Sequence, residues 1–587
     1  MLGSATLTTN DGGLGVSEQL RRPIAVVGCS SSGTADSPVA LSTPDDVTST
    51  FGYGPLAEVL ALVLALAGGP VVGVKAATAT AGVVGGVAQS GAGSAGPGTL
   101  VAAGGNTSTA LPALTGTPDK PYAVKVVVTT AGSNLAASPV VKVSLDGGVT
   151  YLATGSIAAS ASAQAIGTTG LSLAWTDGTF VLNESWTAYG DDSPTTGATS
   201  GTSVLTVSGT PSDAFDVRVQ VTRASSALTA LTGAFKVSLD GGNSYSDEIA
   251  LASTGAYAIP NTGLSLTFGS GTHVVGEVFR FQTSAPAWDT TGLGTALAAL
   301  VTSGRDFEFV HVAGAVDATS AATVKTWLDA REAAGQYTFA VCEARDQLFG
   351  ESVATWQTVL TGSSPGLGTF TGDKQYVMAS HGEIQSAIRA GVYWRRNLAR
   401  LLSARLAKIP LRESPMRVKT GPVEGLKPDG SVSSVYHDGR TYTSLDLARL
   451  GVVQTIAGRP QGEYYFTSRT MASSSSDFSE VQRIRVMNEA ARVGLAAIAE
   501  YVGDDVELKT DGTGRIAERE AKAIEAEVLA KVKAAVLNAP NVHVSSVGVL
   551  VNRTDNVASS RTLRVAISLV PRGSILAVTA TLTYRLS

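Results

Sequence analysis

The apolar positions near the N-terminus predict a strand, a helix and a second strand. Residues 23–28 (PIAVVG) form a short apolar run that is typical of a buried strand. Residues 55–67 are almost wholly apolar and stop at a Gly-Gly-Pro turn, as a buried helix does at its C-terminus. Residues 71–75 return to a strand pattern. We therefore expect a strand–helix–strand unit within 21–80.

A tandem repeat with strand-like alternation follows, after a Gly/Ala-rich linker over 81–114. Residues 141–151 (VKVSLDGGVTY) match residues 235–245 (FKVSLDGGNSY). Apolar and polar residues alternate in each copy, and the Asp-Gly pair predicts a hairpin turn. We expect two similar all-β domains, over 115–190 and 206–286, arranged as beads in series.

Strand and helix patterns alternate from residue 287 to residue 444. Residues 306–312, 337–342 and 375–379 are strand-like, and residues 319–333 are helical. Strands that alternate with helices predict a mainly parallel sheet covered on both faces.

A long amphipathic helix is predicted over Glu383–Lys408. Apolar residues recur on one face, and the six charged residues between Ile384 and Ile409 are all basic. This basic face is either the solvated side of the helix, which is our first interpretation, or a contact surface for an acidic partner. No aromatic platform accompanies it, so nucleic acid is a weaker third option.

A last region over 445–587 contains helical patterns and then strands. Ser479 and Gln482 resemble a capping box at the start of a helix. A second helix carries Glu–Lys pairs four residues apart on its exposed face. The predicted elements are helices over 479–502 and 515–537 and strands over 542–551 and 561–570.

Strand-like stretches also lie at both ends of the chain. The polar, glycine-punctuated arm over 1–20 contains one such stretch, and a second alternating stretch follows the turn at residues 571–573. The residues that we expect to form strands at the two ends are Ala5, Thr6, Leu7, Thr8, Thr9, Ile575, Leu576, Ala577, Val578, Thr579, Ala580, Thr581 and Leu582.

Composition excludes several classes of protein. The 587 residues suffice for several domains, and a net charge of −5 gives no global attraction for nucleic acid or anionic membranes. The two cysteines, Cys29 and Cys342, cannot form a disulfide framework or a CxxC site. We expect no secretory signal, and the apolar run over 56–67 is too short to span a bilayer.

Two literal matches to catalytic motifs fail on their context. Residues 91–96 fit GxGxxG but continue into Pro-Gly, where a dinucleotide site needs a helix. Residues 362–366 fit GxSxG, but Pro365 follows Ser364 and has no N–H for an oxyanion. The histidines show no ligand spacing, so we expect no catalytic residue, cofactor or metal.

Several segments, at the two ends of the chain, resemble the contractile tail sheath family of phages and injection machines. Near the N-terminus these are residues 23–28, then Phe51-Gly52 before a helix, then residues 68–75 (GGPVVGVK). Near the C-terminus, residues 468–471 (SRTM) precede a helix with two arginines, and residues 565–571 (VAISLVP) resemble the closing strand of that family.

The resemblance implies an α+β multidomain fold and a mechanical function. The α/β regions would form a sheath core, the region after residue 445 an assembly domain, and the two β-domains outer-surface insertions. Subunits would stack as hexameric rings in a helical sheath around an inner tube, between baseplate and tail terminator proteins. They would be assembled in the host cytoplasm into a virion tail or injection device, with no direct nucleic-acid contact and no membrane insertion.

The same resemblance suggests where subunits would meet. The terminal strands would add to a sheet of the next subunit, which is a common mode of recognition by main-chain hydrogen bonds. Arginines of the predicted long basic helix and of the helix that follows residue 479 would contact the tube or a neighbouring subunit; they are Arg389, Arg396, Arg400, Arg483 and Arg485.

Two other readings remain open from the residues alone. Tandem β-domains and a high content of Gly, Ser and Thr also fit a surface adhesin or fibre protein. An α/β enzyme with β accessory domains is the second alternative, although no catalytic constellation supports it.

Overall fold

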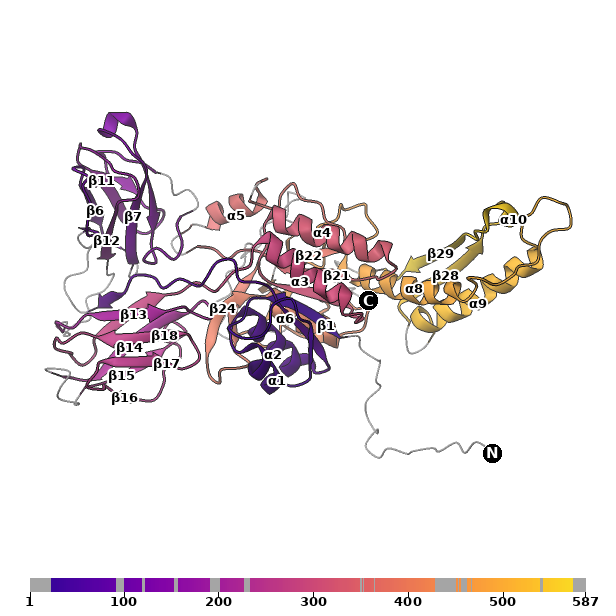
Figure 1. Ribbon diagram of the computed structural model, residues 1–587, viewed down its shortest axis with the longest axis horizontal. Helices are drawn as coiled ribbons and strands as arrows, with labels where there is room; N and C mark the ends of the chain where they lie inside the picture. The colour runs from indigo at the N-terminus through magenta and orange to yellow at the C-terminus, as the bar shows by residue number, and fades with distance from the viewer. Residues whose placement is uncertain are drawn as a thin grey trace, which may run out of the picture.

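The chain folds as a mixed α+β protein with several separate sheets. A computed structural model describes residues 23–90, 100–118, 122–152, 157–190, 201–225, 233–348, 351, 353–363, 365–427, 450–451, 453–455, 462–465, 467–538 and 542–573. Two β-domains lie at one end, an α/β core lies in the middle, and a C-terminal domain lies at the other end (Figure 1).

The core is built on a sheet whose central strands are parallel. The predicted strand–helix–strand unit is present, and its first strand pairs in parallel with a strand from beyond the β-domains, Ala25 beside Val310. Of the described strands in this sheet, β2 alone runs antiparallel to its neighbour. The strands, in sheet order, are β2 (Val39–Leu41), β3 (Val71–Lys75), β1 (Ile24–Gly28), β20 (Phe309–Ala315), β21 (Phe339–Glu343), β22 (Gln375–Met378) and β25 (Leu450–Gly451).

Helices cover both faces of this sheet, as the alternating pattern predicted. One face packs on α1 (Pro44–Phe51), α2 (Pro55–Ala67) and α6 (Ala399–Lys408), which contribute most of their apolar side chains to one buried cluster. The other face packs on α3 (Thr290–Thr302), α4 (Ala318–Ala333) and α5 (Val353–Thr361). The remaining short elements near the core are β26 (Val453–Thr455), β27 (Glu463–Tyr465) and the 3₁₀ turn η3 (Val418–Thr420).

The long helix predicted over Glu383–Lys408 is wrong. Its first half is an antiparallel hairpin of β23 (His381–Gln385) and β24 (Tyr393–Asn397), and only α6 is helical. Gly391 adopts a positive φ of 77° in the turn, a conformation that a helix cannot contain. The three residues before Arg395 are β-branched or aromatic and favour a strand.

The two β-domains repeat the same topology. Each has a three-stranded and a five-stranded antiparallel sheet packed around one apolar cluster. We call the β-domain over residues 100–190 the distal domain and the one that contacts the core the proximal domain. The distal domain contains β5 (Val101–Ala102), β6 (Pro112–Gly116), β7 (Tyr122–Thr130), the 3₁₀ turn η1 (Leu135–Ala137), β8 (Val140–Ser144), β9 (Ile157–Ala158), β10 (Gln164–Ala165), β11 (Leu171–Trp175) and β12 (Ser185–Gly190). The proximal domain contains β4 (Ala88–Ser90), β13 (Leu205–Gly209), β14 (Asp216–Arg223), β15 (Ala234–Ser238), β16 (Ile249–Ala250), β17 (Ala256–Ile259), β18 (Leu264–Phe268) and β19 (Val278–Gln282).

The β-domains are nested, and the expected arrangement in series is wrong. Strand β4 precedes the distal domain in sequence but pairs with β19 of the proximal domain, Gln89 beside Phe279. The distal domain is therefore inserted into the proximal domain, which is itself inserted into the core. The expected linker over 81–114 differs in the same way, since it supplies β4, β5 and β6 to the two domains.

The Asp-Gly pair does not form a tight hairpin turn: β8 and β9 pair antiparallel, and the motif lies in the long loop that connects them. Strand β8 ends at Ser144 and β9 begins at Ile157. In the loop, Asp146 accepts hydrogen bonds from the hydroxyl of Ser144 and from the backbone N–H of Thr150. Asp240 makes the equivalent bonds in the second copy. The repeat therefore preserves the hydrogen bonds inside this loop, and Asp240 in addition accepts one from the backbone N–H of Tyr393 in the core.

The C-terminal domain packs two helices on a hairpin. Helix α8 (Val481–Ala499) leaves the core, α9 (Glu518–Val536) returns beside it, and strands β28 (Val544–Val551) and β29 (Val565–Pro571) flank the short α10 (Val557–Ser560). The predicted capping box is wrong, because α8 starts at Val481 after Glu480 and has no side-chain cap. Among the residues described, no helix combines the length and apolarity needed to cross a membrane.

Nesting makes the distal domain removable at one junction. We expect a variant that lacks residues 91–200, with Ser90 joined to Gly201, to fold with its core and proximal domain unchanged. The junction is short, because the side-chain amide of Gln89 donates to the carbonyl of Gly201 at 3.3 Å. The two ends that the deletion joins are therefore already close together in the folded protein.

Hydrogen exchange of β13, β19 and the core sheet measures whether these elements stay folded when residues 91–200 are removed. A deletion of residues 115–286 is the contrasting variant, since it leaves β4 and β5 without their partner strands. We expect that variant to aggregate. Loss of protection in β19 of the 91–200 deletion would contradict the nested arrangement.

Candidate assembly interface

The hairpin of β28 and β29 has one apolar face and one open face. Alternation along both strands places Val547, Val549, Ile567 and Leu569 against α8 and α9. The opposite face carries small and apolar side chains, of which Leu550 is 60% exposed and Val570 is 53% exposed. The helices therefore cover one side of the hairpin and leave the other side accessible.

Both edges of this hairpin are open within the described part of the chain. Strands β28 and β29 form a two-stranded sheet, in register from Val551 beside Val565 to Ser546 beside Val570. An open edge presents unpaired backbone N–H and C=O groups and is a ready template for another strand. Both edges are therefore open to an added strand, except at Val551, whose backbone N–H donates to Glu525 at 2.7 Å.

The terminal strands expected from the sequence lie outside the described residues. This applies to residues 5–9 and to residues 575–582, so their strand structure stays a prediction. Strand β29 ends at Pro571, and the C-terminal stretch begins four residues later.

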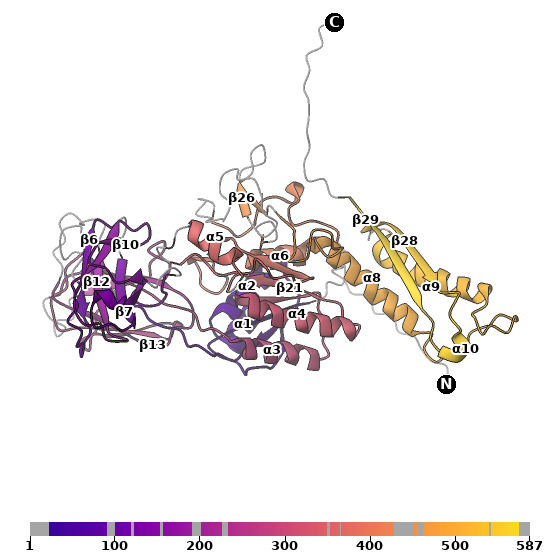
Figure 2. The same ribbon diagram turned by 90° about the horizontal axis from the view of Figure 1, so that it is seen from above.

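Helix α8 joins this hairpin rigidly to the core (Figure 2). Val481 and Ile484 in its first turn belong to the core cluster, whereas Ala490 and Ala497 belong to the cluster under the hairpin. Arg485 is buried, pairs with Glu308, and donates a 2.8 Å hydrogen bond to the carbonyl of Leu406. Motion of the hairpin therefore moves the core with it.

Of the two arginines predicted on α8, only Arg483 stays partly exposed. It pairs with Glu480 at 3.2 Å, three residues earlier. Arg485 is used inside the chain, so in this structure it presents no surface to a partner. A contact of Arg483 with a neighbouring subunit stays a prediction.

Arg389 and Arg396 fasten the proximal β-domain to the core. Arg396 pairs with Asp213 at 3.2 Å and donates to the carbonyl of Ala214 at 2.8 Å. Arg389 donates to the carbonyl of Asn261 at 2.6 Å. These residues lie on the β23–β24 hairpin and its turn, and they join the proximal β-domain to the core.

Trp394 adds an apolar contact between the core and the proximal β-domain. It lies on β24 and is buried in the apolar cluster of the proximal β-domain, 5.9 Å from the ring of Phe215. Lys427 lies outside this cluster but also reaches the domain, because its ammonium donates a hydrogen bond to Asn243 Oδ1 at 3.1 Å. The sequence analysis missed Trp394, because it placed this residue on a helix.

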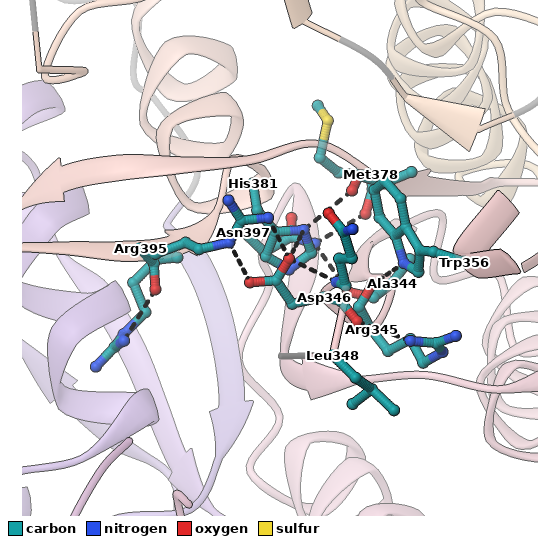
Figure 3. Close-up of polar contacts among 12 residues, drawn as sticks. Ala344, Arg345, Asp346, Leu348, Trp356, Met378, His381, Arg395 and Asn397 are labelled. Atoms are coloured by element: carbon teal, nitrogen blue, oxygen red, sulfur yellow. Dashed lines mark hydrogen bonds and ion pairs between the residues drawn. The ribbon is translucent and has the colours of Figure 1, made fainter. Parts of the chain in front are cut away.

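A partly buried polar cluster fixes the base of the same hairpin (Figure 3). Asp346 accepts two hydrogen bonds from the guanidinium of Arg395, at 2.5 and 2.6 Å. The amide of Asn397 donates to the carbonyls of Ala344 and Met378, which follow β21 and end β22. The hairpin is thereby pinned to the C-terminal ends of two core strands.

Arg400 lies in the interior, in an ion pair with Glu343. Its Nε donates to Glu343 Oε1 at 2.8 Å, and both side chains are buried. Burial alone would raise the pKa of Glu343, but the adjacent Arg400 and His311 hold it well below its usual range. Arg400 is therefore a structural partner within the chain and has no surface for a tube or a second subunit.

The neighbours of this pair resemble a catalytic triad only in composition. Ser403 Oγ lies 2.7 Å from His311 Nδ1, and Glu343 Oε1 lies 3.2 Å from His311 Nε2. In serine hydrolases the nucleophile bonds Nε2 and the carboxylate bonds Nδ1, which is the opposite arrangement. All three side chains are buried, so no substrate reaches Ser403. This cluster gives no support to the enzyme alternative.

Neither of the two literal catalytic motifs gains support from the structure. Residues 91–96 and Ser364 lie outside the described residues. Gly362 follows helix α5, whereas a nucleophile elbow follows a strand. Among the described residues, histidine, cysteine and carboxylate side chains form no group of three that could hold a metal.

Glu58 is a buried carboxylate at the joint between core and β-domain. It is 5% exposed on the otherwise apolar α2. Among the described residues, the hydroxyl of Ser386 donates to this carboxylate, at 2.9 and 3.0 Å from its two oxygens. Burial, together with the negative charge of Asp213, raises the pKa of Glu58 to about 7, against the opposing effects of Arg396 and Arg400. A lone acid inside an apolar helix was the signal that could have identified this site.

The raised pKa of Glu58 predicts that the free energy of unfolding decreases as the pH rises. The unfolded chain ionises Glu58 near pH 4.5, whereas the folded chain keeps the proton up to about pH 7. Stability is therefore full below pH 4.5 and is lost between these values, by on the order of 3 kcal/mol at about 1.4 kcal/mol per pH unit. Glu58→Gln should remove this loss.

Denaturant unfolding at pH 5 and pH 8 measures the difference between Glu58→Gln and the wild type. The variant should be the more stable protein at pH 8, and its advantage should shrink toward pH 5. Glu424→Gln, on the exposed surface, is the matched control and should show no such trend. Equal pH dependence of wild type and Glu58→Gln would contradict this account.

Comparison with known proteins places the chain in a family. Residues 2–469, most of the chain, match the family described as DUF2586, N-terminal domain. The chain belongs to the DUF2586 family. In this DUF2586 protein the β23–β24 hairpin, which joins the β-domains to the core, lies inside the matched segment. Helix α8 and the open hairpin follow that segment. No curated protein matches the chain.

Solved structures that are similar to this DUF2586 protein include two sheath tail proteins. That of Listeria innocua has 11% identity and a TM-score of 0.38, over 94% of this chain and 95% of that one. That of Desulfitobacterium hafniense has 10% identity and a TM-score of 0.37, over 97% and 100%.

A third similar structure comes from the PVC sheath complex of an extracellular contractile injection system, in its contracted state. It has 10% identity and a TM-score of 0.33, over 50% of this chain and 75% of that chain. These TM-scores are below 0.5, so the function is argued from the geometry of the chain itself.

Proposed function

We propose that this DUF2586 protein is a structural subunit of a contractile tail sheath. The observation that carries the proposal is the C-terminal hairpin, covered by α8 and α9 on one face and open at both edges. The sequence supplies strand-like stretches at both termini, which are the segments that such an edge can accept.

Strand addition gives subunits a connection that survives rotation. Main-chain hydrogen bonds between an added strand and the hairpin depend little on side chains, so they can persist while other subunit contacts repack. The core and the hairpin move together through α8, which suits sliding of rigid bodies between two states. Extended and contracted sheaths would be these two states, and contraction would drive the inner tube through a target envelope.

The position of the β-domains supports an outward role for them. They lie at the end of the molecule opposite the open hairpin, in both views (Figures 1 and 2). Nested insertion at one junction leaves the core sheet continuous. We therefore place the β-domains on the outer surface of hexameric rings, with the inner tube, baseplate and terminator proteins as partners of the rest.

The same arrangement bears on where the protein works. A sheath built from this subunit would belong to a virion tail or to an injection device and would be assembled in the host cytoplasm. Its contacts would be with protein surfaces, without membrane insertion or direct binding of nucleic acid.

Electron microscopy of the purified protein, alone and with its tube partner, tests the proposal. Long tubes or stacked rings with sixfold symmetry are the expected result. Dispersed monomers under all conditions would overturn the sheath function and favour an adhesin or an enzyme. Thin fibres without a central channel would favour the fibre alternative specifically.

A further inference from the structure

A cleft at the junction between the core and the open hairpin carries arginines without acidic partners. The cleft, of about 360 Å³, lies between the first turns of α8 and the strand ends of β28 and β29. Arg412 and Arg572 are exposed at this cleft, and no ion pair joins either of them to another described residue. Arg483 lines the cleft as well but is paired with Glu480.

Buried polar atoms beside the cleft also lack partners. Among the described residues, none donates to or accepts from His543 Nδ1 or Gln482 Oε1, although both side chains line the cleft and are more than nine-tenths buried. Burial, together with the positive charges of Arg412 and Arg485, lowers the pKa of His543 to about 4. The imidazole is therefore neutral near pH 7 and can donate a hydrogen bond without adding charge.

The charges around the cleft favour an anion. Among the described residues, Arg412, Arg483 and Arg572 oppose only Asp477 in the lining and Glu480, which pairs with Arg483. Helix α8 also starts here without a side-chain cap, so the positive end of its dipole adds to the field. Guanidinium groups bind carboxylate and phosphate oxygens with matched geometry.

We propose that this cleft is a binding site for an oxyanion, a carboxylate or a phosphate, held by Arg412 and Arg572. The source is an acidic group of a second copy of this chain or free phosphate, and the two sources differ in what the site does. In the first case the proposal rests on the sheath function, because the second copy would be a neighbouring subunit. In the second case it is independent of assembly.

Titration of the full chain with inorganic phosphate at constant ionic strength tests the site. We expect phosphate to raise the unfolding temperature and to shift the ring resonances of His543, since a bound anion raises the pKa of a nearby imidazole. Arg412→Gln and Arg572→Gln should each weaken phosphate binding by about tenfold. Arg519→Gln, which removes an exposed arginine on α9, should leave it unchanged.

Assembly of the same variants identifies the source. If a subunit supplies the anion, the double variant Arg412→Gln/Arg572→Gln needs a higher protein concentration to form polymers, and phosphate inhibits assembly of the wild type alone. If free phosphate is the ligand, the double variant assembles normally but has lost the phosphate effect.

Absence of phosphate binding, together with normal assembly of the double variant, would overturn the oxyanion site and leave the sheath function standing. Failure of the wild type to assemble at all would count against the sheath function, and the phosphate titration would still decide the site. Equal phosphate binding by the wild type and the double variant would likewise overturn it.

Discussion

Removal of either terminal arm should abolish polymers of this protein and leave its monomer folded. Deletion of residues 1–20, or of residues 575–587, takes away a strand that the open hairpin would receive from a neighbour. A strand of five or more residues contributes several main-chain hydrogen bonds, each worth about 0.5–1.5 kcal/mol net. Loss of several such bonds at every subunit contact is expected to be decisive.

Sedimentation and electron microscopy measure the loss, and circular dichroism checks the fold. The variant that lacks residues 91–200 is the matched control, because it removes far more chain at the opposite end of the molecule. It should still form polymers. Polymers of normal length from both armless variants would show that subunits are joined elsewhere.

Arg400→Met should destabilise the core by about 3–5 kcal/mol. The substitution removes one partner of a buried ion pair and leaves the carboxylate of Glu343 with His311 and the backbone N–H of Gly314. Burial of an unpaired charge is much less favourable than burial of the pair. The effect should appear as lost hydrogen-exchange protection in β20, β21 and α6.

Two further variants separate the charge from the packing. Arg400→Met combined with Glu343→Gln should recover most of the lost stability, since it leaves no unpaired charge. Arg519→Met breaks an exposed pair with Glu507 and should leave the free energy of unfolding nearly unchanged, since solvent screens such a pair. An Arg400→Met protein as stable as Arg519→Met would mean that Glu343 finds another partner.

Elements with one strong local pattern were predictable from the sequence. Helix α2 begins and ends at the predicted residues, because its apolar run is bounded by Pro55 and Gly68. Strands β1, β3 and β22 follow short apolar runs in the same way. In each case burial and local propensity favour the same structure.

The β23–β24 hairpin was not predictable from apolar spacing alone. Ile384 and Ile388 are four residues apart and fit a helical face, but only Ile384 lies on a strand, and the turn contains Gly391. The strand is selected by contacts distant in sequence, chiefly Trp394 in the β-domain cluster and Asn397 on the ends of the core strands. Tertiary packing here overrides a periodicity that is locally plausible.

Nesting was hidden for a related reason. Strand β4 has three residues and no pattern of its own, and its partner β19 follows almost two hundred residues later. The arginines of the predicted basic helix were correctly seen as unusual, but their partners Asp213 and Glu343 lie on other elements. Charge alone did not reveal that Arg396 and Arg400 act within the chain.

The central claim is that neighbouring subunits are joined by strand addition to the β28–β29 hairpin. Cysteine cross-linking between chains tests it most directly, because the native Cys29 and Cys342 are buried. One chain would carry Leu550→Cys on the open face of β28, and a second, distinguishable chain would carry Thr8→Cys or Val578→Cys.

Oxidation of the mixed polymers should give covalent dimers that contain one chain of each kind, and unpolymerised mixtures should give none. Polymers that form normally but yield no mixed dimers with either arm would contradict strand addition at this hairpin.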